Sequence, residues 1–157
     1  MKLNIMTTVS ALALIAGSAA VTLCLSTGAT PVAASSARNG QIQITKNCSA
    51  YTGGAGSHCT ITSSNLAEIP AGTTVYYDQA AGIPNNMLDS NVVLYVSSGN
   101  WATGRCTLDS NNLGVCTFSD GTGPLTGFTA RVNVAPLPDG VDYTWTGTYS
   151  FTAQPVR

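Results

Sequence analysis

Residues 104–151 constrain the fold of this chain more than any other stretch. Cys106 and Cys116 lie ten positions apart around a segment of turn-forming residues. Between Phe128 and Val134, apolar and polar residues alternate, as is typical of a strand with one buried and one solvated face. The segment Tyr143–Phe151 places its aromatic side chains on one face and its threonines on the other. Together these patterns predict an antiparallel β-structure.

The whole chain extends the same pattern. Its 157 residues suit one domain, and only 8% are charged. A sheet with so few charges cannot protect its edges with lysines, so closure into a barrel is favoured. We predict an all-β fold, an eight-stranded antiparallel barrel, with an immunoglobulin-like β-sandwich as the alternative. The predicted strands are Gln41–Thr45, His58–Ser63, Thr73–Asp78, Val92–Val96, Trp101–Leu108, Val115–Ser119, Gly127–Val134 and Tyr143–Phe151, with long loops at Ala80–Asn91 and Ala135–Asp142.

The first segment has the composition of a secretory signal peptide. Lys2 precedes a largely apolar run, and small residues follow it. We predict a signal peptide over residues 1–34 with cleavage after Ala34 or, as a second possibility, after Ala20. An uncleaved membrane anchor is the alternative. Residues 35–40 are then a flexible lead-in, residues 41–157 the single barrel domain, and the protein is secreted or extracytoplasmic, with the cell surface as one location.

The cysteine pattern agrees with export. Four cysteines remain after residue 34, and four permit three pairings. The local pairs Cys48–Cys59 and Cys106–Cys116 are favoured by geometry, since a turn between Cys106 and Cys116 makes them cross-strand neighbours. Each bridge is expected to contribute about 2–3 kcal/mol. A four-cysteine zinc site is disfavoured, because the sequence has neither a C-x-x-C pair nor a histidine at ligand spacing.

The charges exclude several functions. A formal net charge of −1 gives no basic field for nucleic acid, and no Lys/Arg cluster is available for anionic lipid. We therefore expect no nucleic-acid partner and no stable membrane insertion after cleavage. No metal, no cofactor and no known catalytic motif is predicted, and His58 is expected to be a surface or structural residue.

The candidate ligand-binding residues lie on the apolar face and at strand ends. An eight-stranded barrel can be filled by side chains or can hold one small ligand. If it is hollow, Tyr77, Phe128, Trp145 and Tyr149 are expected to line the lumen. The carboxylate of Asp78 ends an apolar strand and is a candidate acid at the barrel mouth. Arg131, and with it Arg105, could hold a carboxylate or oxyanion if the polar face is the lumen.

A family resemblance rests on residues 104–130. Gly121, Gly123 and Gly127 have the spacing G-x-G-x-x-x-G, and they follow the cysteine hairpin. This arrangement resembles the superfamily of allene oxide cyclase and dirigent proteins. The resemblance implies an eight-stranded antiparallel barrel with an apolar cavity, often trimeric, that binds or steers small apolar molecules by cyclising an epoxide or orienting phenoxy radicals. No catalytic residue of that superfamily can be placed on this chain.

Three functions follow from these patterns. The first is a module that binds or steers a small apolar molecule in the lumen. The second is a secreted or cell-surface protein-interaction domain without catalytic activity. The third is an isomerase or cyclase, which requires a polar group buried in the lumen. The sequence leans away from an enzyme, and a homo-oligomer is a possible assembly.

Overall fold

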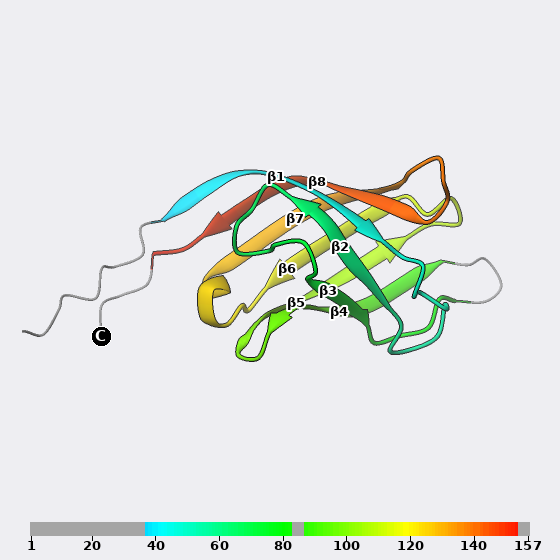
Figure 1. Cartoon of the computed structure of the whole chain (residues 1–157), viewed down its shortest axis with the longest axis horizontal. Coiled ribbons are helices and arrows are strands. Elements are labelled where there is room, and N and C mark those ends of the chain that lie inside the picture. Colours follow the sequence, from blue (N-terminus) through cyan, green and yellow to red (C-terminus); the bar gives the residue numbers. More distant parts are fainter. Residues whose placement is uncertain (1–36, 83–86, 154–157) are drawn as a thin grey trace, which may run out of the picture. The chain divides into compact units, whose positions relative to one another are not determined.

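The structure, a computed structural model, describes residues 37–82 and 87–153. The predicted signal peptide and the first two lead-in residues lie outside the described residues. The described part holds eight strands and one short 3₁₀ helix (Figure 1). They are β1 (Arg38–Asn47), β2 (His58–Ser64), β3 (Thr74–Tyr77), β4 (Leu88–Ser97), β5 (Asn100–Leu108), β6 (Gly114–Ser119), η1 (Gly123–Leu125), β7 (Phe128–Pro136) and β8 (Asp142–Phe151).

The strands form a closed antiparallel barrel. Each strand pairs with the next in sequence, and β1 pairs with β8 to complete the ring. The β1–β8 ladder runs over ten residue pairs, from Arg38 opposite Phe151 to Asn47 opposite Asp142. The predicted eight-stranded barrel is confirmed, and the alternative of an immunoglobulin-like sandwich is wrong because one continuous ladder joins all strands. Strand β1 begins at Arg38, inside the predicted lead-in, because Arg38–Gly40 pair with Tyr149–Phe151.

The barrel interior is mostly filled by side chains. Along β7 the residues Phe128, Ala130, Val132 and Val134 are buried, and the residues between them are exposed. Aromatic rings from different strands meet inside, with the ring centroids of Phe118 and Trp145 separated by 5.2 Å. The largest fully buried side chains are Trp145, Tyr77, Phe128, Ile44, Ile61, Ile69, Leu94, Leu125, Val75, Val92, Val132 and Thr73.

Both predicted cysteine pairs are disulfides in the structure. Cys106 and Cys116 are direct cross-strand partners on β5 and β6, and their Cα atoms lie 4.1 Å apart. The turn between them is stabilised by Asp109, whose carboxylate accepts hydrogen bonds from the backbone N–H groups of Asn111 and Leu113 at 2.8 and 3.0 Å. The second disulfide joins Cys48, just after β1, to the second residue of β2, with Cα atoms 4.3 Å apart.

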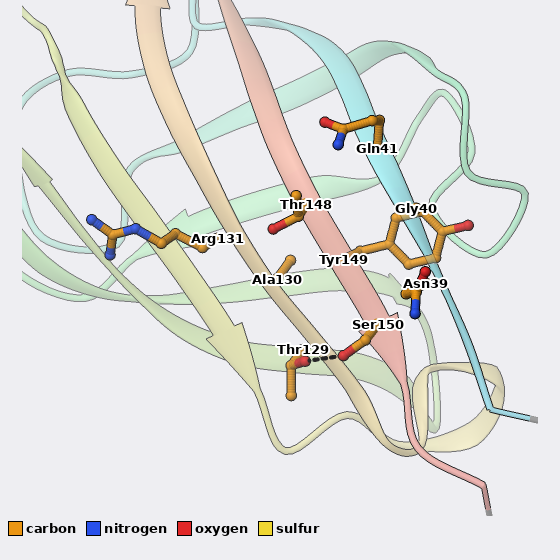
Figure 2. A pocket seen from close by; sticks show the side chains of 9 residues that line it. All are labelled: Asn39, Gly40, Gln41, Thr129, Ala130, Arg131, Thr148, Tyr149 and Ser150. Carbon is orange, nitrogen blue, oxygen red and sulfur yellow. Dashed lines mark hydrogen bonds between the residues drawn. The ribbon is translucent and has the colours of Figure 1, made fainter.

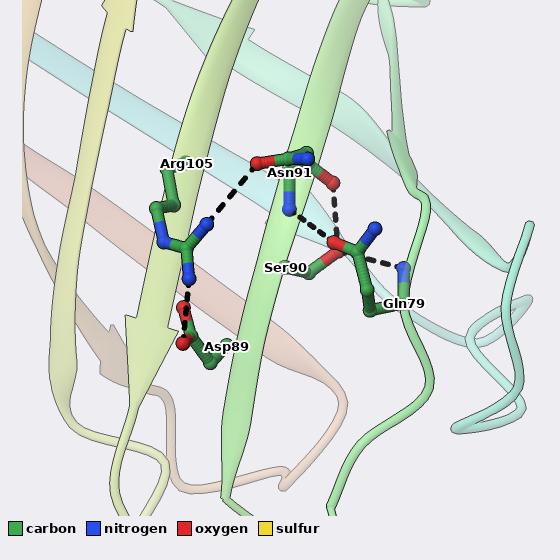
Figure 3. A network of polar contacts seen from close by, with 5 residues as sticks. All are labelled: Gln79, Asp89, Ser90, Asn91 and Arg105. Carbon is green, nitrogen blue, oxygen red and sulfur yellow. Dashed lines mark hydrogen bonds and ion pairs between the residues drawn. The ribbon is translucent and has the colours of Figure 1, made fainter.

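Strand β4 begins earlier than the sequence indicated. Leu88–Asn91 were predicted as loop, but Leu88 and Ser90 are buried on the inner face of β4. Turn-forming residues fit a strand here because their polar groups are satisfied: the backbone N–H of Gln79 donates to Ser90 Oγ at 3.1 Å, and Ser90 Oγ donates to the Asn91 carbonyl at 2.7 Å. Figure 3 shows this network.

The same network continues on the outer face of the barrel. Arg105 on β5 forms an ion pair with Asp89 at 2.7 Å and donates to the side chain of Asn91 at 3.3 Å (Figure 3). Both partners of the ion pair are more than half exposed. An exposed ion pair of this kind contributes about 0–1 kcal/mol to stability, so its main effect is to fix the positions of the two side chains on the outer face.

Candidate functional site

Lys46 is the only lysine among the described residues, and the barrel encloses its side chain. It lies on β1 with the same inward orientation as Ile42 and Ile44, and it is 2% exposed. A β-bulge between Thr45 and Lys46 shifts the pairing with β2, so that the buried Ile61 lies opposite Lys46. The lysine is therefore fixed in the barrel wall with its side chain in the interior.

Aromatic side chains surround the Lys46 amine. Its Nζ donates a hydrogen bond to the hydroxyl of Tyr77 on β3. The Nζ also lies 4.7 Å from the ring centroid of Trp145, 5.1 Å from that of Tyr77 and 5.5 Å from that of Tyr143. The faces of these rings attract an ammonium group, but they replace only part of the hydration that burial removes.

Among the described residues, no carboxylate offsets the burial of Lys46. The ion pairs of the described residues are Arg38–Glu68 and Arg105–Asp89, and neither includes the lysine. Burial disfavours the charged form, and it lowers the pKa of Lys46 from 10.5 to about 7. About half of the molecules therefore carry a neutral amine at pH 7, and a neutral amine has a free electron pair.

Three tyrosines stay protonated beside this amine. Burial raises the pKa of Tyr77, Tyr51 and Tyr143 above the ordinary value of 10.0. Tyr51, from the loop after β1, packs edge-on against Tyr77 with ring centroids 5.2 Å apart. Its buried hydroxyl, like the indole Nε1 of Trp145, has no hydrogen-bond partner among the described residues. Such groups are costly unless a ligand or water satisfies them.

A cavity of about 50 Å³ opens beside the amine, and we call it the Lys46 cavity. It lies at the end of the barrel where β1 ends and β8 begins, on the right in Figure 1. The Cys48–Cys59 disulfide forms part of its wall. One water molecule needs roughly 10–15 Å³ of such volume, so the cavity has room for a group of a few non-hydrogen atoms. The lining residues are Lys46, Cys48, Tyr51, Cys59, Tyr77, Ala81, Leu88, Leu108 and Tyr143.

The predicted ligand-binding residues lie in three places, because two aromatic pairs lie toward opposite ends of the barrel and Asp78 and Arg131 lie on its outside. Tyr77 and Trp145 lie against the Lys46 amine. Phe128 and Tyr149 are toward the opposite end of the barrel, where both pack against Phe151 at centroid distances of 5.2 and 5.9 Å. The six predicted residues therefore do not form one site.

The charged residues proposed from the sequence are outside the barrel. Asp78 and Arg131 are exposed, and so is Arg105. Their strand positions direct them to solvent, because their neighbours Tyr77 and Val132 take the inward positions. The polar group that an isomerase or cyclase needs in the lumen is not supplied by any of these three.

Sequence reasoning did not select Lys46. The signal was present, because Lys46 continues the alternation of Ile42 and Ile44 directly after the predicted strand Gln41–Thr45. A lysine is rarely fully buried without a partner, so alternation alone does not predict its burial. The three tyrosines that accompany it come from separate parts of the chain, and only the fold brings them together.

A second hollow lies on the outer face of β1, β8 and β7, and Figure 2 shows the side chains around it. Its volume is about 510 Å³. Thr129 and Ser150 form a hydrogen bond of 2.7 Å at one end. We call it the outer groove; it is lined by Asn39, Gly40, Gln41, Thr129, Ala130, Arg131, Thr148, Tyr149 and Ser150.

Two further properties of the described residues concern metal ions and membranes. These contain no group of three or more His, Cys, Asp or Glu side chains placed to hold a metal ion. In the same residues, no helix has the length and apolar character to cross a membrane.

Comparisons of the chain with protein-family models, with curated proteins and with solved structures find no match.

Proposed function

We propose that this protein binds one small, largely apolar molecule through a polar end group in the Lys46 cavity. The observation that carries the proposal is a buried amine that faces a cavity and lacks a carboxylate partner among the described residues. Perturbed ionisable groups in a cavity mark functional sites more often than other positions. Among the described residues, the hydrogen bond to Tyr77 and the three aromatic rings offset only part of the stability lost by burying Lys46.

The walls of the cavity indicate the ligand's chemistry. Leu88, Leu108, Ala81 and the Cys48–Cys59 disulfide offer apolar surface. The Tyr51 hydroxyl offers an unpartnered hydrogen-bond donor, and the neutral amine can both donate and accept. The arrangement suits a short hydrocarbon chain that ends in a hydroxyl or a carbonyl oxygen.

The cavity volume limits both ligand size and affinity. Pockets for drug-sized ligands measure roughly 300–1,000 Å³, far more than the Lys46 cavity. A ligand of about five non-hydrogen atoms gains at most ~1.5 kcal/mol per atom. We therefore expect dissociation constants in the micromolar to millimolar range for a complete small ligand, and the same site could bind the end of a longer one.

The two tryptophans provide the test. Trp145 touches the Lys46 amine, whereas Trp101 lies on β5 and lines no part of the cavity. The variant Trp101→Phe leaves Trp145 as the sole indole reporter, and Trp145→Phe is the matched control. Titration with butanol and butanal is expected to change the fluorescence of the first variant saturably and not that of the second. A thermal shift of the unchanged protein with the same compounds checks the result; no saturable response in either measurement would refute the proposal.

The outer groove supports a second candidate function, recognition of a polar partner at the protein surface. Its rim combines the guanidinium of Arg131 with the side-chain amides of Asn39 and Gln41 (Figure 2). Such groups are typical of a protein-interaction surface. The double variant Arg131→Ala/Gln41→Ala is expected to abolish binding to an extracellular partner and leave the thermal stability unchanged. Binding that survives this variant would refute the outer groove as the interaction surface.

We also propose that the protein is exported to an extracytoplasmic location. Two disulfides are typical of proteins from oxidising compartments, which supports an extracytoplasmic location. The resemblance to allene oxide cyclase and dirigent proteins stays a prediction. The closed barrel is compatible with it, but a fold alone does not identify a function. The predicted homo-oligomer likewise stays a prediction.

A further inference from the structure

Because the sequence has few lysines, the chemistry of the cavity can be tested with reagents that react with amines. Lys2 and Lys46 are the only lysines in the sequence. Lys46 is also the sole amine-bearing side chain in the described part of the chain, and its Nζ faces the Lys46 cavity. A reagent that reacts with amines therefore reports on the cavity with little background from other side chains.

We propose that Lys46 Nζ forms an imine with the carbonyl carbon of a small aldehyde or ketone bound in the Lys46 cavity. This inference rests on the proposed function, and it narrows the ligand class to carbonyl compounds with a short apolar body. The apolar walls hold the hydrocarbon part, and the carbonyl carbon is brought to the amine at the inner end.

The covalent step balances without a further reactant. The electron pair of neutral Nζ forms the C–N bond as the carbonyl π-bond breaks, and the oxygen takes up a proton. Loss of water from this carbinolamine gives C=N, and both protons of the amine leave with the oxygen. The surrounding hydroxyls can pass these protons, since Tyr77 is hydrogen bonded to Nζ and Tyr51 has an unpartnered hydroxyl among the described residues.

Two features of the surroundings favour this reaction. Among the described residues, the ionisable groups that face the amine are Tyr77 from β3 and Tyr143 from β8, and Tyr51 from the β1–β2 loop packs on Tyr77. All three are neutral near pH 7. No fixed negative charge among the described residues holds the lysine in its ammonium form. The pKa of about 7 then leaves roughly a thousandfold more neutral amine at pH 7 than an ordinary lysine has.

The experiment traps the imine by reduction. The full chain is incubated at pH 7 with butanal and cyanoborohydride, and peptides are mapped by mass spectrometry. The adduct adds the mass of butanal less one oxygen atom. Lys46 is expected to be alkylated at least tenfold faster in the native protein than in guanidinium with the disulfides intact, where its amine is solvated. An excess of butanol should slow the labelling of Lys46 in the native protein but not in guanidinium.

Each outcome decides between the two proposals. Labelling of Lys46 that is no faster in the native protein, or that butanol does not slow, overturns the imine. If butanal and butanol still change Trp145 fluorescence in that case, the binding function survives without the covalent step. If neither compound binds, both proposals fail. The variant Lys46→Arg keeps a cation but cannot form an imine, so loss of the adduct with retained folding supports the assignment; the comparison of native with denatured wild type holds even where that variant fails to fold.

Discussion

Replacing Lys46 with methionine should stabilise the protein, and the gain should depend on pH. Methionine has a similar length and no charge to desolvate. In the unfolded chain Lys46 binds its proton up to pH 10.5, whereas in the folded chain it releases the proton near pH 7. The unfolded state therefore binds more protons between these values, so wild-type stability rises with pH there.

The size of the effect follows from the two pKa values. The shift from 10.5 to about 7 corresponds to a destabilisation of roughly 5 kcal/mol at pH 5, about 4 kcal/mol at pH 7 and about 2 kcal/mol at pH 9. This is a large part of the 5–15 kcal/mol that is typical of a folded domain. Loss of the hydrogen bond to Tyr77 subtracts about 1 kcal/mol at every pH, so the slope is the diagnostic quantity.

Guanidinium denaturation between pH 6 and 9, with the disulfides intact, measures this difference. The advantage of Lys46→Met over wild type should shrink by about 1 kcal/mol per pH unit between pH 7 and pH 9. Arg105→Met is the matched control, because it removes a cation whose side chain is 56% exposed. Its effect should not vary with pH in this range. A difference between Lys46→Met and wild type that is flat with pH would refute the burial of Lys46 as a neutral amine.

Three further predictions concern the same framework. Trp145 emission in Trp101→Phe should change with a midpoint near pH 7, since Lys46 Nζ lies 4.7 Å from the indole ring, and adding Lys46→Met should remove this titration. Replacing either cysteine pair with serines should lower the free energy of unfolding by about 2–3 kcal/mol, but only Cys48/Cys59 should also weaken binding of butanol, because that pair lines the cavity. Gly147→Ala should destabilise the barrel by several kcal/mol in denaturation, because its Cβ would lie 2.0 Å from the Arg131 carbonyl oxygen, whereas Gly54→Ala should have an effect near zero; equal effects of the two glycine variants would contradict the close approach of β7 and β8.

Alternation within each segment was sufficient to predict the strands and their buried faces, but it did not by itself distinguish a barrel from a sandwich. Strand β8 illustrates this, since the face shared by Trp145 and Phe151 was readable from spacing alone. The cysteine pairing was equally readable, because a turn at Asp109 places Cys106 opposite Cys116.

The candidate site was not readable in the same way. Whether a lysine on an inward position is buried depends on what covers it, and Tyr51, Tyr77 and Tyr143 reach Lys46 from a loop and two strands that are distant in sequence. The exposed positions of Asp78 and Arg131 follow from strand register, which a one-residue shift would have reversed. For Asp78, which directly follows the four-residue strand β3, composition and spacing do not determine that register, whereas Arg131 lies on the polar face that alternation predicts for β7.

The ladder between β1 and β8 also sets the order in which the lysine's surroundings are assembled. The first strand carries Lys46, and the last strand supplies Tyr143 and Trp145 that cover it. Ring closure joins the two most distant strands in the sequence, which is the slowest kind of contact to form. Until β8 docks, the amine is solvated, protonated at neutral pH and poor as a nucleophile. Under the proposed imine chemistry, completion of the barrel is therefore also the step that makes the amine reactive toward carbonyl compounds.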